Sequence, residues 1–114
     1  MTLIYKIIAA EAWAAARQKG VFAGAAIDLA DGYIHFSSAA QVEETASKHF
    51  AGEANLLLVA FDANQFGTAL KWEVSRGGAL FPHLYTTLDP ASALWSRPLP
   101  LTGGIHVFPK DWRR

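Results

Sequence analysis

The chain has 114 residues, 52% of them hydrophobic and 18% charged. It can bury one core and is too short for two ordinary domains. Ten basic residues balance ten acidic ones, which argues against a module that binds bulk nucleic acid by neutralising phosphates. The absence of cysteine excludes disulfides, thiol catalysis and zinc–thiolate sites.

Neither a membrane span nor a signal peptide is expected. The longest apolar stretch near the middle of the chain, Leu56 to Phe61, is far too short to cross a bilayer. The N-terminus enters a strand-like run at once, without the basic and apolar regions of a signal peptide. We therefore expect a single domain over residues 1–114 in the cytoplasm. The sequence leaves the oligomeric state open.

The first third of the chain alternates between strand and helix signals. Thr2 to Ile8 is β-branched and apolar and predicts a strand. Ala9 to Lys19 is rich in alanine and predicts a helix, with Gly20 as its left-handed cap. Ala23 to Ile27 predicts a short edge strand, and the pair Asp31-Gly32 predicts a turn.

A strand and a second helix follow. Tyr33 to Phe36 predicts the strand, with His35 and Ser37 on the face opposite Phe36. Ser38 and Gln41 match a capping box, so we expect Ser38 to cap a helix that ends at Gly52.

The rest of the chain predicts mainly strands. Asn55 to Asp62 is almost continuously apolar, which is typical of a central strand buried on both faces. Further strands are predicted at Leu70 to Ser75, Phe81 to Thr86, Leu94 to Leu101 and Ile105 to Phe108. This order indicates an α+β domain in which two helices pack on a strongly bent or split, mostly antiparallel sheet.

His35 and Ser37 are the first candidate functional residues. Their alternation places an imidazole beside a hydroxyl where a strand meets a helix. His35 can equally be a half-buried ring with satisfied hydrogen bonds, and Ser37 can be part of the helix cap. No Gly-x-Ser-x-Gly pattern supports Ser37 as a nucleophile.

Two later segments add polar candidates. Glu73 alternates away from the apolar side of its strand and is either a functional carboxylate or an ordinary exposed residue. Arg76 precedes two glycines whose backbone N–H groups can approach an anion, although a plain connecting loop explains them equally well. His83 and Tyr85 project together from the strand that follows.

The first strand offers Tyr5 and Lys6, for which a rim tyrosine and a solvated lysine are the simpler interpretation. No pair of histidines has the close helical spacing of a zinc helix, so no metal site is predicted.

Most of these residues carry a resemblance to a known family. The chain resembles the bacterial domain-of-unknown-function 952 family over nearly its whole length, with the matching residues in the same order. The matching residues are Ile4-Tyr5-Lys6-Ile7, Trp13, Gly20, Asp31 to Ser37, Trp72-Glu73, Gly77-Gly78 and Phe81 to Tyr85. The family has no established function, so the resemblance implies the fold more than the activity.

Two segments resemble another group. Tyr33 to Ser37 is similar to the histidine-containing strand of the RNA 2′-phosphotransferases, and Gly77 to Tyr85 is similar to their later Gly and Pro-x-Tyr segment. Those enzymes belong to the ADP-ribosyltransferase superfamily, which binds NAD in a cleft between the halves of a split sheet. The phosphotransferases carry an arginine and histidines on earlier strands, where this chain has Tyr5 and Lys6.

The resemblance implies roles for several residues. His35 would orient or contact an NAD-like ligand, Tyr85 or Trp72 would stack on nicotinamide, and Glu73 would stabilise a ribosyl cation. The expected catalytic residues are thus His35 and Glu73. The expected NAD-binding residues are Tyr5, Lys6, Ser37, Trp72, Arg76, His83 and Tyr85.

Three functions follow from these observations. The first is an NAD-dependent transferase of the ADP-ribosyl type. The second is a non-catalytic module that holds a nucleotide or another small ligand. The third is an interaction protein whose contact surface includes Trp95 and Trp112.

Overall fold

The computed structural model describes residues 1–113, apart from the side chain of Arg76. Its helices and strands are β1 Leu3–Ala9, α1 Ala10–Lys19, α2 Ala26–Asp31, β2 Ile34–His35, β3 Ser37–Ser38, α3 Val42–His49, β4 Leu56–Asp62, β5 Leu70–Ser75, β6 Ala79–Leu84, β7 Trp95–Leu99, β8 Leu101–Thr102 and β9 Ile105–His106. Short 3₁₀ turns lie at Ala63–Ala69, Arg76–Gly78 and Pro90–Ser92. The expected α+β class is confirmed. The expectation of two helices is wrong, because the described residues form three α-helices.

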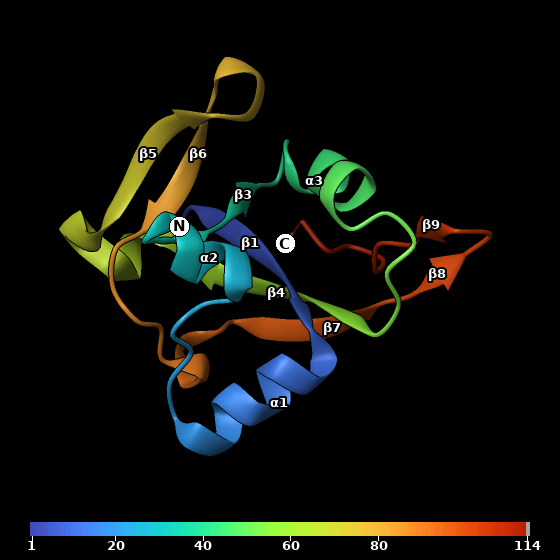
Figure 1. Cartoon of the computed structure of the whole chain (residues 1–114), viewed down its shortest axis with the longest axis horizontal. Helices are drawn as coiled ribbons and strands as arrows, with labels where there is room; N and C mark the ends of the chain where they lie inside the picture. The colour runs from blue at the N-terminus through green and yellow to red at the C-terminus, as the bar shows by residue number, and fades with distance from the viewer. Residues whose placement is uncertain (114) are drawn as a thin grey trace.

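The strands form two main sheets. A four-stranded sheet has the order β3-β1-β4-β7, and a three-stranded sheet has the order β2-β6-β5. Neighbouring strands in both sheets are antiparallel. The β5–β6 hairpin projects from the body of the molecule, and α1 lies at the opposite end of the view (Figure 1).

β4 is the central strand that its apolar sequence predicted. Val59 and Phe61 belong to one core cluster, whereas Leu58 and Ala60 belong to the other. The first cluster also contains residues of α1 and of the three-stranded sheet, and the second contains residues of α3 and of the C-terminal segment. Burial on both faces explains why the apolar residues of β4 run almost without interruption.

Of the strand predicted from Tyr33 to Phe36, only Ile34 and His35 form a strand, β2, and the residues directly after Phe36 form β3 in the other sheet. β2 pairs with β6, whereas β3 pairs with β1. Between them, the Phe36 N–H donates to the Pro82 carbonyl oxygen at 3.0 Å. The chain therefore crosses from one sheet to the other at a single residue, and this crossing is the split in the sheet.

The predicted edge strand from Ala23 to Ile27 is wrong. The chain there leads into α2, where the backbone N–H of Ala25 donates to Oδ2 of Asp28 at 2.8 Å. An acidic residue that accepts from the start of a helix is a typical N-terminal stabiliser. The apolar residues of this segment masked that signal.

The start of α3 corrects another detail. Ser38 lies in β3, and Gln41 is the N-cap of α3. Gln41 still reaches back as predicted, since its Oε1 accepts from the Ser38 N–H at 3.0 Å. The helix ends at His49, before the expected Gly52.

Trp112 does not form a contact surface. It is only 8% exposed, and its ring packs edge-on against Tyr5 with centroids 5.1 Å apart. The ring of Trp95 also lies near Tyr5, with centroids 6.1 Å apart. Both tryptophans thus contribute to the core between the four-stranded sheet and the C-terminal segment.

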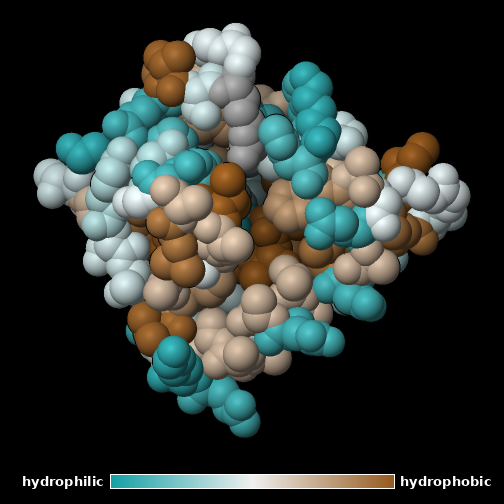
Figure 2. Space-filling view, viewed as in Figure 1, coloured by the Kyte–Doolittle hydropathy of each residue, from teal (hydrophilic) through white to brown (hydrophobic). Residues whose placement is uncertain are grey.

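The β5–β6 hairpin has two unlike faces, set by its antiparallel register. One face carries apolar residues, and those near the hairpin end are exposed: Trp72, Val74 and Leu80. Apolar groups are visible at this end in the space-filling view (Figure 2). The other face carries polar and aromatic side chains. No helix in the described part of the chain has the length and apolarity needed to cross a membrane.

Candidate functional site

The candidate site lies on the polar face of the three-stranded sheet. His35 on β2 is directly opposite His83 on β6, and His83 is directly opposite Lys71 on β5. Residues directly opposite each other in an antiparallel sheet share a face. Tyr33 and Tyr85 lie beyond the histidine pair on the same face, next to one another.

The rings on this face touch one another in a continuous cluster. Tyr33 stacks on His83 with centroids 4.1 Å apart and planes inclined by 27°. Tyr33 also lies 4.7 Å from His35 and 5.3 Å from Tyr85. The two histidine rings meet edge to face at 5.6 Å. Tyr33 therefore joins both histidines and Tyr85 into one surface.

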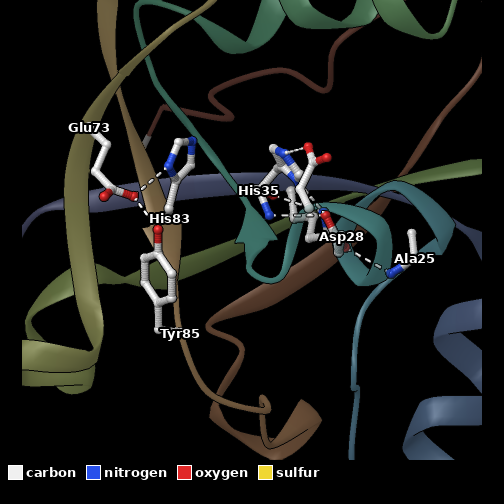
Figure 3. Close-up of polar contacts among 8 residues, drawn as sticks. Ala25, Asp28, His35, Glu73, His83 and Tyr85 are labelled. Carbon is white, nitrogen blue, oxygen red and sulfur yellow. Dashed lines mark hydrogen bonds and ion pairs between the residues drawn. The ribbon is translucent and has the colours of Figure 1, made fainter.

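Glu73 adds a carboxylate to this cluster. Its Oε1 accepts from the Tyr85 hydroxyl at 2.7 Å and lies 2.9 Å from Nδ1 of His83 (Figure 3). The hydrogen bond from Tyr85, followed by that from His83, lowers the pKa of Glu73. The same bond to Glu73 raises the pKa of Tyr85 to about 12. Near neutral pH, Glu73 is therefore ionised and Tyr85 is a neutral donor.

Replacing Tyr85 by phenylalanine tests this assignment. The pKa of Glu73 is expected to rise toward its ordinary value, because the variant removes its main hydrogen-bond donor and keeps the ring. Carboxyl ¹³C NMR titration measures this pKa directly. An unchanged Glu73 pKa in Tyr85→Phe would contradict the hydrogen bond, and Tyr33→Phe serves as the control on a neighbouring ring.

A second polar group holds His35 from the side of α2. Asp28 is 2% exposed, and its Oδ1 lies 2.6 Å from Nδ1 of His35 and accepts from the His35 backbone N–H at 3.0 Å. Asp31, one turn further along α2, lies 2.9 Å from Nε2 of the same ring. Both contacts are hydrogen bonds only when both ring nitrogens carry protons. His35 is therefore fixed in orientation, with a carboxylate oxygen at each of its two ring nitrogens.

Lys6 completes this group. Its Nζ lies 3.2 Å from Oδ2 of Asp28 and donates to the His35 carbonyl oxygen at 2.8 Å. Lys6 is buried, contrary to the interpretation of a solvated lysine. It ties the four-stranded sheet to both α2 and β2.

Asp28 is the central residue that the sequence did not reveal. It lies just after a segment that reads as a strand, and no motif marks it. The available signal was the spacing of Asp28 and Asp31, which share one side of a short helix that ends at Gly32. That spacing becomes informative only once α2 is recognised.

Two hollows border the polar face at opposite ends. One has a volume of about 260 Å³ and is lined by residues that include Asp28, Tyr33 and Tyr85. The other, of about 170 Å³, lies between α3 and the β5–β6 hairpin and reaches Phe81. Phe81, His83 and Tyr85 alternate along one side of β6, so the clustered rings lie between the two hollows.

The remaining predicted residues do not belong to the cluster of rings, although Tyr5 and Ser37 line one small hollow together with Lys6 and His35. Tyr5 is fully buried on the other side of β1 from Lys6. Ser37 pairs with Thr45 of α3 through their hydroxyls at 2.9 Å. Trp72 lies on the apolar face of β5 and borders another hollow. The side chain of Arg76 lies outside the described part of the structure.

One atom of this site is unusual. Nε2 of His83 is buried and has no hydrogen-bond partner among the described residues. Within the described part of the chain, no group of three or more histidine or carboxylate side chains could hold a metal ion.

Comparisons with known proteins agree with this fold. A family model described as "Protein of unknown function (DUF952)" matches residues 7–96. The crystal structure of Protein CC0527 from Caulobacter crescentus is 50% identical, with a TM-score of 0.89 over 93% of this chain and 94% of that chain. The solution NMR structure of CC0527 has a TM-score of 0.83 over 93% and 91% of the two chains. No curated protein matches the chain. The chain therefore belongs to the DUF952 family, which is described as having unknown function.

Proposed function

We propose that the chain binds NAD on the polar face of the three-stranded sheet and acts as an ADP-ribosyl-type transferase. The observation that carries this proposal is the meeting of an ionised carboxylate, two imidazoles and two tyrosine rings on one face. The similarity of Tyr33 to Ser37 and of Gly77 to Tyr85 to the RNA 2′-phosphotransferases supports the same ligand. NAD supplies a glycosidic bond whose cleavage leaves positive charge on the ribose.

Glu73 has the properties that this chemistry needs. Its side chain is 39% exposed, so a ligand can reach it, and its lowered pKa keeps it charged at neutral pH. Fixed negative charge beside a carbon that becomes positive stabilises the transition state. His83 and Tyr85 hold this carboxylate in place through hydrogen bonds to one oxygen.

The tyrosines and His35 have binding roles in this proposal. Tyr33 and Tyr85 border the hollow of about 260 Å³, slightly below the roughly 300 Å³ at the lower end for whole-ligand pockets. This volume suits one ring of a dinucleotide, and the second hollow beside α3 can accept a further part. Asp28 fixes the His35 ring, while the more exposed Asp31 is the contact that a ligand would replace.

The test combines ligand binding with turnover. NAD is expected to raise the melting temperature of the wild-type protein, and His35→Ala is expected to lose this increase. Glu73→Gln should still bind NAD but consume it roughly 100-fold more slowly or worse. Matched controls are His106→Ala, which removes a distant imidazole, and Glu11→Gln, which neutralises an exposed carboxylate on α1.

A non-catalytic binding module is the second candidate. Carboxylates engage both ring nitrogens of His35. This favours the binding module, because neither nitrogen is then available as a general base. NAD binding that His35→Ala abolishes, with no consumption of NAD by the wild-type protein, would select this function over the transferase. If NAD, ADP-ribose and nicotinamide all leave the melting temperature unchanged, both proposals fail.

A further inference from the structure

His83 is held in one orientation by Glu73. The carboxylate of Glu73 is ionised and can only accept hydrogen bonds, so Nδ1 of His83 must carry the proton at their 2.9 Å contact. In the neutral ring, this leaves Nε2 without a proton and able to accept. The Glu73 contact thus selects the tautomer of a ring that is 2% exposed.

The accepting nitrogen has no partner. Nε2 is buried and makes no hydrogen bond to the described residues, although buried polar atoms are nearly always paired. The two nitrogens of an imidazole point in widely different directions, so Nε2 is directed away from Glu73. In the close-up, the second nitrogen lies on the side of the ring toward His35 (Figure 3).

The surroundings of this nitrogen match a planar ligand. The face of the His83 ring is covered by Tyr33 at 4.1 Å, and Tyr33 and Tyr85 border the hollow of about 260 Å³. Tyr33 follows Gly32, which has a φ of 88° and ends α2. A planar ring entering from this hollow would lie beside Tyr33, the same ring that covers His83.

We infer that Nε2 of His83 accepts a hydrogen bond from the ligand, and that the site selects ligands carrying an N–H or O–H donor on a planar ring. This inference rests on the proposed function and extends it from the identity of the ligand to the group that is recognised. The carboxamide of nicotinamide is such a donor. A ring bearing only an acceptor leaves Nε2 unpaired.

Two dinucleotides that differ by one donor provide the test. NAD carries a carboxamide, whereas 3-acetylpyridine adenine dinucleotide has a methyl group in place of the amide nitrogen and the same charge. By isothermal titration, the wild-type protein is expected to bind NAD at least about tenfold more tightly, since one hydrogen bond is lost. His83→Asn should bind both equally, because asparagine can still donate to Glu73 but has no atom at the Nε2 position.

Two further measurements guard against a misfolded variant. His83→Gln places an amide oxygen near the position of Nε2 and is expected to restore part of the preference for NAD. In the wild-type protein with ¹⁵N-labelled histidine, the Nε2 resonance of His83 should move when NAD is added. This readout requires no substitution and no turnover.

The outcomes separate this inference from the proposed function. Equal affinity of the wild-type protein for both dinucleotides, or an Nε2 resonance unmoved at saturating NAD, would overturn the role of His83. In that case, loss of NAD binding in His35→Ala would still support the proposed function. If neither dinucleotide binds, the proposed function fails and the inference fails with it.

Discussion

Replacing Asp28 by alanine is expected to lower the free energy of unfolding by about 3–5 kcal/mol, because it removes the carboxylate that balances the charge of the buried Lys6 ammonium group. The variant also removes the acceptor for the backbone N–H groups of Ala25 and His35. A loss of this size is a large part of the roughly 5–15 kcal/mol that stabilises a typical domain. Urea denaturation measures this loss. Asp28→Asn retains one oxygen, so its free energy of unfolding should lie between those of the wild-type protein and Asp28→Ala.

Asp31→Ala is the matched control for this prediction. Asp31 also contacts the His35 ring, but its side chain is 41% exposed. Exposed ion pairs contribute about 0–1 kcal/mol, so this variant should change the free energy of unfolding by no more than that. Equal losses in the two variants would contradict the central role assigned to Asp28.

The pH dependence of stability provides an independent check on Asp28. Burial alone would raise its pKa, but the hydrogen bond from His35, the charge of Lys6 and two backbone N–H groups together lower the pKa from 3.8 to about 2. The folded-state pKa thus lies below the unfolded-state value, and this contribution to stability is present above pH 3.8. It amounts to about 2 kcal/mol and is lost as the pH falls through about 2. The stability difference between wild type and Asp28→Asn should shrink over the same interval.

Gly24→Ala is expected to destabilise the protein by at least about 2 kcal/mol, since it combines backbone strain with a steric clash. Gly24 has a φ of 127°, and an added Cβ would lie 2.8 Å from the Cβ of Asp28. That contact would push α2 away from β2 and disturb the Asp28–His35 pair. Urea denaturation gives the energy, and the histidine NMR spectrum reports on the His35 ring.

Gly20→Ala separates the two causes. Gly20 also has a positive φ, of 84°, but an added Cβ there would meet no heavy atom within 4 Å. Only the cost of backbone strain remains in Gly20→Ala. That cost is about 1–2 kcal/mol for a residue with a side chain in the left-handed region. If Gly24→Ala costs no more than Gly20→Ala, the close packing of Gly24 against α2 contributes nothing.

The regular parts of this fold could be predicted because their patterns are local. The continuous apolar run gave β4 nearly to the residue, and the alternation from Leu70 to Ser75 gave both the bounds and the faces of β5. The same alternation predicted that His83 and Tyr85 share a side. These features depend only on whether apolar and polar residues alternate along the strand.

The site was only partly predictable because its geometry depends on long-range pairing. His35 and Ser37 are two residues apart and were expected to lie side by side. However, the chain changes sheets between them, so His35 joins His83 while Ser37 joins Thr45 of α3. Tyr5 was a candidate because of its sequence neighbours, yet its face of β1 turns to the core. No local pattern specifies which strand will pair with a two-residue segment.

The crossing at Phe36 also bears on how a ligand would bind. The two sheets are joined there by a single buried residue, and the Lys6 ammonium group joins them again through the His35 carbonyl oxygen. Hinge closure of one sheet on the other would have to break that contact or move Phe36 out of the core. Binding is therefore expected to be nearly rigid at the backbone, with adjustment confined to side chains such as Tyr33 and Asp31. Little of the binding energy would then be spent on rearranging the protein.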